Sequence, residues 1–326
     1  MKGGTGKLRW GVLGCANFAR TRALPAMRAA SSVDLVAVAS RSMERACAFQ
    51  QEFAAKTAFG SYEELIAAPG VDAVYIPLPK TLHAEWTIRA LRAGKHVLCE
   101  KPLAVTAAEA ESVAAAARET GLHVMEAFMW RLHPQHARAR ELIRQGRIGA
   151  VRLIRGAFTF TISREPNIRL MSDLGGGSLM DVGCYPISAA RYYFDAEPLR
   201  AIAFSRTDPE YGVDIAVSGA LEFEQGMALF DCGFHLPFRG ELEVHGETGS
   251  LLLPAAWLPP EKAALVVGGQ TEELPPADQY VLEFEAFSRA VLDNRPLPFD
   301  AEDAVRQARA LDAVRRAAQS GRAEPL

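Results

Sequence analysis

The sequence has few cysteines, and they are not arranged as a disulfide framework or a zinc site. Among 326 residues there are five cysteines, an odd number, scattered along the chain without a C-x-x-C pair. Such usage is typical of reduced thiols in a cytosolic protein. The sequence therefore predicts a cytoplasmic protein, and we expect no metal site.

Long apolar runs and a strong charge of either sign are also absent. No stretch approaches the ~20 apolar residues that span a bilayer, and the first residues lack the apolar core of a signal peptide. The 36 basic and 39 acidic residues leave a formal net charge of only −3, so no overall field attracts nucleic acid or anionic lipid. We therefore expect neither a membrane nor a nucleic-acid partner, and we expect the ligands to be small molecules.

The residues that are present favour two packed domains. At roughly 100–200 residues per domain, 326 residues with 49% hydrophobic side chains supply two cores. Up to about residue 127, short apolar runs alternate with stretches of 3.6-residue periodicity, which predicts a parallel sheet with crossover helices. The predicted strands are 9–13, 34–40, 73–77, 96–100 and 123–127, and the predicted helices are 17–30, 42–55, 61–68, 82–93 and 106–120.

The second part of the chain, residues 128–326, is dominated by β-type runs. These are 151–161, 199–206, 213–223, 227–234, 241–246 and 250–253, with helices predicted at 135–146, 184–194, 278–293 and 302–318. Consecutive strands joined by short turns are typical of antiparallel pairing. We predict an α/β protein overall, with a C-terminal α+β domain on a large, mostly antiparallel open sheet. Its last helices are candidates to pack back on the first domain.

The first predicted strand leads into a glycine turn. From Gly14 the sequence reads G-x-A-x-x-A, which departs from the dinucleotide-binding G-x-G-x-x-G but keeps small residues at the same spacing. Glycines at such a turn let backbone N–H groups and the helix N-terminus approach a pyrophosphate. An ordinary glycine turn of an α/β protein is the alternative. We predict an NAD(P)-binding Rossmann domain over residues 1–127, with contacts from Gly11, Gly14, Cys15, Ala16, Asn17 and Phe18.

The end of the second predicted strand indicates which dinucleotide binds. An Asp or Glu there would accept a hydrogen bond from a ribose 2′-hydroxyl and favour NAD. Instead the strand ends in Ser40 and Arg41, a hydroxyl and a guanidinium that suit a 2′-phosphate. We predict NADP as the cofactor, with NAD as the alternative if Arg41 is only a solvated residue before the next helix.

Two further segments carry candidate catalytic side chains. Glu100 and Lys101 follow the strand 96–100, at the edge of the sheet where ligands of such folds bind. The second segment, 175–186, reads GGGSLMDVGCYP and contains Asp181 and Tyr185. On a helix these two side chains would lie one turn apart on one face. Pro186 favours a first helical turn, and would instead place the helix start near Cys184.

These motifs, with several others in a fixed order, resemble a known family. The others are Pro77-Leu78-Pro79 followed by His83, the run 126–135 (EAFMWRLHPQ), and Asn167-Ile168-Arg169-Leu170. Together they resemble the glucose-fructose oxidoreductase, inositol dehydrogenase and MocA family of NAD(P)-dependent oxidoreductases, from Leu8 to beyond residue 300. The chain is most similar to the branch with NADP-dependent sugar dehydrogenases, dihydrodiol dehydrogenases and nucleotide-sugar 3-ketoreductases.

The resemblance implies hydride transfer between nicotinamide and a carbinol or carbonyl carbon of a sugar or related cyclic polyol. Alcohol oxidation needs a general base and ketone reduction a general acid. Tyr185 falls where inositol dehydrogenases carry a catalytic histidine, and we assign it this role. A phenol of ordinary pKa ~10 needs a cation to stabilise its anion, which Lys101 can supply, while Asp181 orients a sugar hydroxyl. The reverse assignment, with Lys101 as proton donor, stays open.

Other residues are assigned by the same resemblance. Pro77, Leu78 and His83 border the cofactor with Glu100, and a helix cap or a core residue is the alternative for His83. Arg131, Asn167 and Arg169 are candidates to bind substrate, with surface ion pairing as the alternative. His133 and His136 lack an accompanying carboxylate or thiolate and do not predict a metal site. The open sheet is the expected interface of a homodimer or a dimer of dimers.

Two other functions remain as alternatives. The first is a 3-ketoreductase of nucleotide-linked sugars in deoxysugar biosynthesis, which would need room for a diphosphonucleotide. The second is a non-catalytic NAD(P)-binding regulatory protein on the same fold. The presence of both Lys101 and Tyr185 disfavours the regulatory protein.

Overall fold

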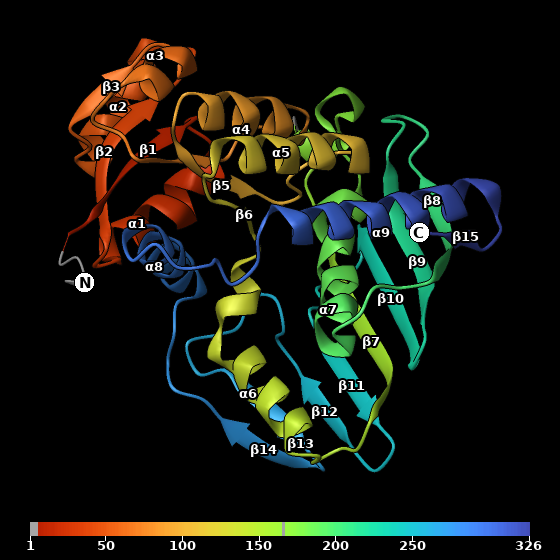
Figure 1. Ribbon diagram of the computed structural model, residues 1–326. Coiled ribbons are helices and arrows are strands. Elements are labelled where there is room, and N and C mark those ends of the chain that lie inside the picture. The colour runs from red at the N-terminus through yellow and green to blue at the C-terminus, as the bar shows by residue number, and fades with distance from the viewer. Residues whose placement is uncertain (1–5, 165–166) are drawn as a thin grey trace. The chain divides into compact units, whose positions relative to one another are not determined.

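The computed structural model describes residues 6–164 and 167–326, which form two compact units (Figure 1). Unit 1 comprises the described residues up to Met129 together with Asp278–Val305. Unit 2 comprises Trp130–Ala277 and Arg306–Leu326. Each unit has its own sheet, so each is described by itself.

Unit 1 is built on a six-stranded sheet in the order β3-β2-β1-β4-β5-β6, in which every pair of neighbours is parallel. This is the predicted parallel sheet with crossover helices, and it confirms the N-terminal part of the fold class. The strands are β1 (Leu8–Leu13), β2 (Val33–Ala39), β3 (Thr57–Phe59), β4 (Ala73–Ile76), β5 (His96–Glu100) and β6 (Val124–Ala127).

The helices of unit 1 begin where side-chain caps predict. Ser42, Ser61 and Thr106 each accept a hydrogen bond from the backbone N–H three residues later. This N–H group has no acceptor within the helix, so the side chain supplies one. The helices are η1 (Ala19–Ala23, a π-turn) running into α1 (Leu24–Ala29), α2 (Met43–Phe53), α3 (Tyr62–Ala67), η2 (Lys80–Leu82), α4 (His83–Arg92), α5 (Ala107–Thr120) and α8 (Gln279–Leu292).

Helix α8 comes from the C-terminal part of the chain but packs in unit 1. Trp10 of β1 lies 5.5 Å from the ring of Phe284 and 5.1 Å from that of Phe287, and its indole N–H donates to Ser288 Oγ at 3.0 Å. Trp10, Phe284 and Phe287 are fully buried. Aromatic side chains of this size contribute much of a core's hydrophobic stabilisation, so α8 is part of the unit 1 core.

Unit 2 is built on a nine-stranded sheet in the order β14-β13-β12-β11-β7-β10-β9-β8-β15. Of its strand pairs only β7 and β10 run parallel, so the predicted mostly antiparallel sheet is confirmed. The strands are β7 (Val151–Phe160), β8 (Arg200–Thr207), β9 (Asp214–Phe223), β10 (Gly226–Phe234), β11 (Leu242–Gly246), β12 (Ser250–Leu253), β13 (Ala264–Val267), β14 (Gln270–Glu273) and β15 (Glu324–Pro325).

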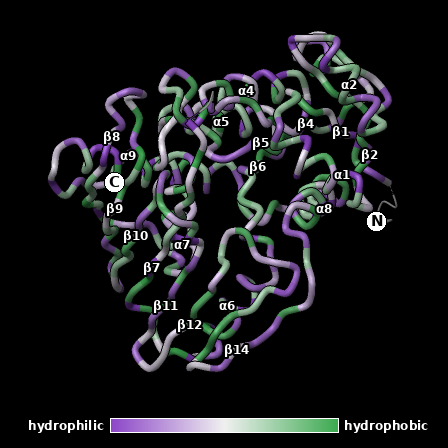
Figure 2. Tube along the Cα trace, turned by 180° about the vertical axis from the view of Figure 1, so that it is seen from behind, coloured by the Kyte–Doolittle hydropathy of each residue, from purple (hydrophilic) through white to green (hydrophobic). Residues whose placement is uncertain are grey.

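Helices cover one face of this sheet. The π-turn η6 (Leu179–Gly183) and α7 (Cys184–Phe194) pack on β7 and β10, whose residues are largely hydrophobic in colour in Figure 2. The remaining helical elements are η3 (Met129–Leu132), α6 (Pro134–Arg144), η4 (Ile168–Leu170), η5 (Ser172–Leu174) and α9 (Ala301–Ser320). In the part of the chain that the structure describes, no helix has the length and hydropathy needed to cross a membrane.

Candidate functional site

The predicted pyrophosphate-binding turn of unit 1 contains a glycine with a positive φ. Gly14 follows β1 with a φ of 116°, a conformation that residues with a side chain rarely adopt. A Cβ at Gly14 would lie 2.8 Å from a methyl carbon of Leu78, and its N–H donates to Ala39 O at 2.9 Å. The turn thus brings together the carboxyl ends of β1 and β2 and the loop after β4. The contact of this turn with the pyrophosphate of a dinucleotide stays a prediction.

Gly11 has a different environment from the turn glycine. It lies within β1, and a Cβ there would come within 2.6 Å of Leu65 and 3.2 Å of Val71. The structure therefore gives Gly11 a role in packing α3 against the sheet. Its predicted contact with the cofactor stays a prediction.

Two guanidinium groups lie at the start of α2, near the end of β2. Arg41 is exposed and interacts with the phenol of Tyr62. Burial raises the pKa of this phenol, and the cation of Arg41 offsets part of the rise. Arg45 donates through Nη2 to Cys15 O at 3.0 Å. Sequence reasoning missed Arg45, because its contact with the glycine turn depends on how α2 packs. Ser40 Oγ accepts the N–H of Ser42 at 3.2 Å and so shapes the same loop.

The loop that carries Lys101 is joined to the loop after β4. His83, only 1% exposed, lies with Nδ1 2.7 Å from Pro102 O and Nε2 2.7 Å from Leu78 O. Burial lowers the pKa of His83 to about 4, so the ring is neutral and donates to one of these carbonyls at a time. The peptide between Lys101 and Pro102 is cis. His83 thus holds loop backbone, and a direct contact with the cofactor stays a prediction.

Glu100, the last residue of β5, lies in a cluster of ionisable side chains. It accepts a hydrogen bond from the hydroxyl of Tyr75 at 2.6 Å. Burial and Glu100 both raise the pKa of Glu283. The same two causes contribute most to the raised pKa of Tyr280. The Tyr280 ring packs 5.9 Å from that of Phe18, after the glycine turn. Sequence reasoning missed Tyr280 and Glu283, because only the fold places α8 in unit 1.

In unit 2 a second glycine turn precedes the candidate catalytic residues. Asp214 of β9 accepts hydrogen bonds from Ser178 Oγ and from Leu179 N–H, both at 2.7 Å. Gly177, with a φ of 114°, packs directly against this carboxylate, where a Cβ would collide with it. Asp214 therefore fixes the start of η6. Sequence reasoning missed it, since it lies on a strand far along the chain.

Asp181 and Tyr185 lie on successive turns of one helical segment. The structure combines both predicted geometries, because α7 begins at Cys184 with Pro186 in its first turn, while Asp181 lies on the preceding π-turn. Tyr185, 4% exposed, packs edge-to-face on Phe158 at 5.0 Å and lies 5.8 Å from the Trp257 ring.

Arg169 joins this pair and makes a group of three within unit 2. Its Nε donates to Asp181 Oδ2 at 2.7 Å. The negative charge of Asp181 is the largest cause of the raised pKa of Arg169, and Tyr185 also raises it. Asn167 Oδ1 accepts the N–H of Arg169 at 3.1 Å, so Asn167 shapes the loop that presents the guanidinium. The arrangement sets a cation close to a phenol, which would stabilise the phenolate.

Arg131 and the neighbouring histidines have other surroundings in unit 2. The guanidinium of Arg131 lies 5.2 Å from the centre of the Tyr192 ring. His136 is buried between Tyr193 Oη at 2.9 Å and Ala256 O at 2.8 Å, and burial lowers its pKa to about 3. Over residues 6–164 and 167–326, no group of three or more His, Cys, Asp or Glu side chains could hold a metal ion.

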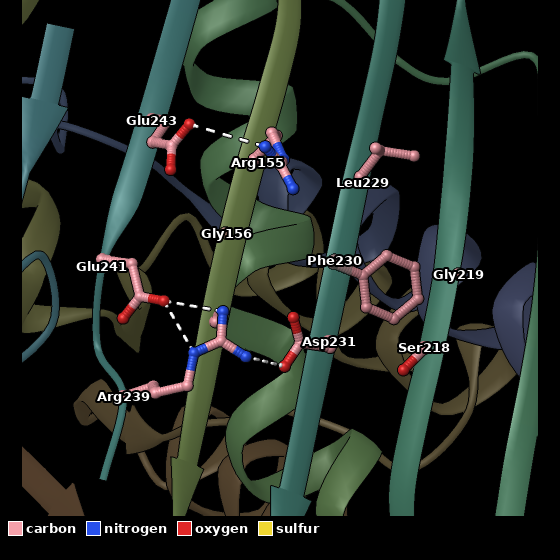
Figure 3. Close-up of a pocket in the computed structure, with 11 residues that line it drawn as sticks. Arg155, Gly156, Ser218, Gly219, Leu229, Phe230, Asp231, Arg239, Glu241 and Glu243 are labelled. Atoms are coloured by element: carbon pink, nitrogen blue, oxygen red, sulfur yellow. Dashed lines mark hydrogen bonds and ion pairs between the residues drawn. The ribbon is translucent and has the colours of Figure 1, made fainter.

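The face of the unit 2 sheet opposite α7 has a shallow polar pocket of about 310 Å³ (Figure 3). Gly156 faces Pro186 of α7, so Arg155, its neighbour along the strand, points to the opposite face. Figure 3 shows Arg239 between Asp231, at 2.7 Å, and Glu241, and Arg155 directed toward Glu243. The charges in this pocket pair with one another.

Comparison with known proteins identifies both units. Residues 8–128 match the model of an oxidoreductase family with an NAD-binding Rossmann fold, and residues 136–252 match the GFO/IDH/MocA C-terminal domain. A dTDP-3,4-didehydro-2,6-dideoxy-alpha-D-glucose 3-reductase from Actinomadura kijaniata is 39% identical, covering 96% of both chains. A D-xylose 1-dehydrogenase (NADP(+)) from Haloferax volcanii is 39% identical over 98% of this chain and 100% of the relative.

Solved structures give the same result. A 3-ketoreductase from Actinomadura kijaniata, in complex with NADP and TDP-benzene, has a TM-score of 0.90 at 37% identity, covering 96% of this chain and 98% of that one. An aldose-aldose oxidoreductase from Caulobacter crescentus, complexed with glycerol, has a TM-score of 0.91 at 30% identity, covering 98% and 100%. These matches confirm the resemblance seen in the motifs, and the chain belongs to the glucose-fructose oxidoreductase, inositol dehydrogenase and MocA family of oxidoreductases.

Proposed function

We propose that this protein is an NADP-dependent oxidoreductase that transfers a hydride between nicotinamide and a carbinol or carbonyl carbon of a sugar or related cyclic polyol. The observation that carries the proposal is the group of Tyr185, Asp181 and Arg169 on the helix-covered face of unit 2. A phenol beside a cation and an oriented carboxylate suits proton transfer to a hydroxyl or carbonyl oxygen.

Each candidate residue has a distinct role in this mechanism. The bound nicotinamide supplies the hydride acceptor or donor. Tyr185 removes the hydroxyl proton during oxidation and returns it during reduction, Lys101 stabilises the phenolate and binds the reacting oxygen, and Asp181 orients a neighbouring hydroxyl. Arg169 fixes Asp181 through their 2.7 Å ion pair. The alternative assignment, in which Lys101 donates the proton and Tyr185 positions the substrate, is tested below.

The proposed cofactor contacts lie at the ends of four strands of unit 1, β1, β2, β4 and β5. Gly14 to Phe18 would hold the pyrophosphate, Ser40 and Arg41 the 2′-phosphate, and the segments with Pro77, Leu78, Glu100 and Lys101 the nicotinamide end. The conformation of Gly14 and the exposed guanidinium of Arg41 support this assignment. NADP in the similar 3-ketoreductase and the NADP(+) dependence of the Haloferax dehydrogenase support NADP as the cofactor.

We expect Arg41→Ala to weaken NADP⁺ binding by about 10-fold to 100-fold, because a charge-assisted contact to phosphate contributes roughly 1.5–3 kcal/mol. Binding of NAD⁺, which lacks the 2′-phosphate, should change less than about twofold. Fluorescence titration of both cofactors measures the difference. Arg89→Ala, which removes an exposed guanidinium paired with Glu63 and Glu85, is the control. Unchanged NADP⁺ affinity in Arg41→Ala would refute the assignment.

The substrate is either a free sugar or cyclic polyol, or a nucleotide-linked sugar. The second candidate is favoured by the 3-reductase that is 39% identical and by the 3-ketoreductase solved with TDP-benzene. A panel of keto-sugars with and without a nucleoside diphosphate, followed by NADPH absorbance with NADH in parallel, separates the two. Turnover of unlinked ketones supports the main proposal, and a strict requirement for the nucleotide supports a 3-ketoreductase. NADPH binding without any turnover would indicate the regulatory alternative.

We also propose that the open face of the unit 2 sheet is a homodimer interface. Register places Ile202, Ala220, Leu229 and Arg155 side by side across four strands on this face. Phe204, two residues after Ile202 on β8 and therefore on the same face, is 70% exposed. Exposed apolar side chains beside paired charges are typical of protein interfaces. Light scattering should give a dimer or a dimer of dimers for the wild type and smaller species for Phe204→Glu, whereas a monomeric wild type would contradict the proposal.

The proposed location is the cytoplasm. All five cysteines are free, namely Cys15, Cys47, Cys99, Cys184 and Cys232, and all except Cys47 are buried. Reduced thiols are usual where glutathione and thioredoxin act. Cell fractionation with antibody detection tests the location directly.

A further inference from the structure

The segment that carries Asp181 and Tyr185 departs from regular α-helix geometry. Its first part, η6, is a π-turn, and α7 begins only at Cys184. Pro186, in the first turn of α7, has no backbone N–H and donates no hydrogen bond to the preceding turn. Single π-turns of this kind are rare and occur frequently at functional sites. The position of the segment therefore depends in part on groups that bind it from outside.

One such group is the side chain of Gln307 on α9. Gln307 lies in the part of α9 that belongs to unit 2 and is 1% exposed. Its Nε2 donates to the carbonyl oxygen of Cys184 at 3.0 Å. That carbonyl is part of the planar peptide that joins Cys184 to Tyr185, so the hydrogen bond holds the backbone of Tyr185. The thiol of Cys184 donates to the carbonyl oxygen of Asp181 at 3.5 Å, which links the same residue to the π-turn.

Arg191 of α7 determines which end of the Gln307 amide faces Cys184. Arg191 is 5% exposed and donates through Nη1 to Gln307 Oε1 at 3.0 Å. A guanidinium only donates, so the amide oxygen must face Arg191 and the amide nitrogen must face the carbonyl. At 3.6 residues per turn, Cys184 and Arg191 lie about two turns apart on the same face of α7. Gln307 thus binds two successive parts of the helix with opposite ends of one amide.

Glu197 closes this hydrogen-bond network. Its two carboxylate oxygens accept from Nε and Nη2 of Arg191, at 2.7 and 3.0 Å. The same carboxylate pairs with Arg306, which precedes Gln307 on α9, at 3.1 Å. A bidentate pair between a guanidinium and a carboxylate fixes geometry as well as supplying energy. The amide of Gln307 therefore cannot turn away from Cys184 without breaking buried hydrogen bonds, which is costly.

We propose that Gln307 is a positioning residue of the reaction, which sets the place of the Tyr185 hydroxyl by holding the carbonyl of Cys184. Asp214 binds the other end of the segment, through the N–H of Leu179 at 2.7 Å. Both ends of the segment are thus held by side chains from distant parts of the chain. A displacement of about 1 Å at a reacting group can cost roughly 10²-fold in rate. This inference rests on the proposed role of Tyr185.

The first test replaces Gln307 by methionine, which has a similar length and no amide. We expect kcat with saturating NADPH and a keto-sugar to fall by about 10-fold to 100-fold. The Kd of NADPH should change less than about twofold, because the proposed cofactor contacts lie in unit 1. Arg191 keeps both of its bonds with Glu197, and circular dichroism checks that the variant is folded. Gln319→Met, at an exposed position near the end of the same helix, is the matched control and should keep wild-type kcat.

A double-mutant cycle separates positioning of Tyr185 from a general loss of structure. If Gln307 acts through the phenol hydroxyl, Gln307→Met should cause little further loss of kcat in a Tyr185→Phe background. A role elsewhere in unit 2 would give the same fold-change in both backgrounds. Additive losses would therefore overturn the inference.

Gln307→Glu distinguishes the two hydrogen bonds of the amide. An ionised carboxylate still accepts from Arg191 but cannot donate to the carbonyl of Cys184. This variant should therefore lose as much kcat as Gln307→Met. Recovery of wild-type kcat would show that only the bond with Arg191 matters and would overturn the inference. If Gln307→Met does not fold, Gln307→Glu takes its place in the cycle, because Arg191 stays paired.

Failure of this inference is separable from failure of the proposed function. Wild-type kcat in Gln307→Met would remove Gln307 from the reaction while leaving Tyr185 in its role. Wild-type turnover in Tyr185→Phe, or a wild type that turns over no keto-sugar, would overturn the proposed function and the inference with it.

Discussion

Turnover is expected to fall by about 10²-fold to 10⁴-fold when Tyr185 is replaced by phenylalanine, the range that general acid–base groups contribute. The substitution removes only the hydroxyl. The ring remains packed on Phe158 and Trp257 in a site that is 4% exposed, so the melting temperature should stay within a few degrees of the wild type. Steady-state kcat with saturating NADPH and a keto-sugar measures the loss.

Tyr192→Phe is the control for this experiment. Tyr192 lies on the same helix, and its ring is covered by the guanidinium of Arg140 at 4.6 Å, a contact that phenylalanine retains. This variant should keep wild-type kcat. Wild-type turnover in Tyr185→Phe would remove Tyr185 from the mechanism.

The second large effect is expected for Lys101→Met, with a loss of kcat of about 10²-fold or more. Methionine has a similar length but no charge, so it removes the cation that we propose to stabilise the phenolate. If Tyr185 transfers the proton, the limb of the pH profile that reports its ionisation should move to higher pH in Lys101→Met, because the anion loses its stabilisation. The pH dependence of kcat measures this shift.

The same profiles decide between the two assignments of the proton donor. If Lys101 donates the proton, Lys101→Met should lose the limb entirely and Tyr185→Phe should keep it. Lys56→Met is the control, because it removes only an exposed ion pair with Asp34, at 2.6 Å. Wild-type kcat in both Lys101→Met and Tyr185→Phe would contradict the whole proposed site.

Periodicity was sufficient to predict much of the fold. The predicted strands 9–13 and 96–100 correspond to β1 and β5, and the predicted helix 106–120 to α5, because apolar spacing and capping residues are local signals. The strands β3, β13, β14 and β15 were missed, since segments of two to four residues carry few side chains in which an alternating pattern can show.

The site was less predictable than the fold. Motifs identified Lys101, Asp181 and Tyr185 as candidates, and the structure brings Asp181 and Tyr185 together with Arg169. The groups around them were not predictable. Asp214 and Glu283 act through contacts between residues far apart in the chain, which depend on how strands and helices pack rather than on local spacing.

The assignment of α8 to unit 1 has a consequence for synthesis of the chain on the ribosome. Trp10 and Tyr75 emerge early, but their partners Phe284 and Phe287 are translated more than 200 residues later. Until then the early sheet lacks the helix that covers these aromatic side chains. Although N-terminal domains generally fold first during synthesis, unit 1 lacks part of its core until residues 278–305 have been translated. We therefore expect a nascent chain halted near residue 130 to leave these aromatic side chains without their helix.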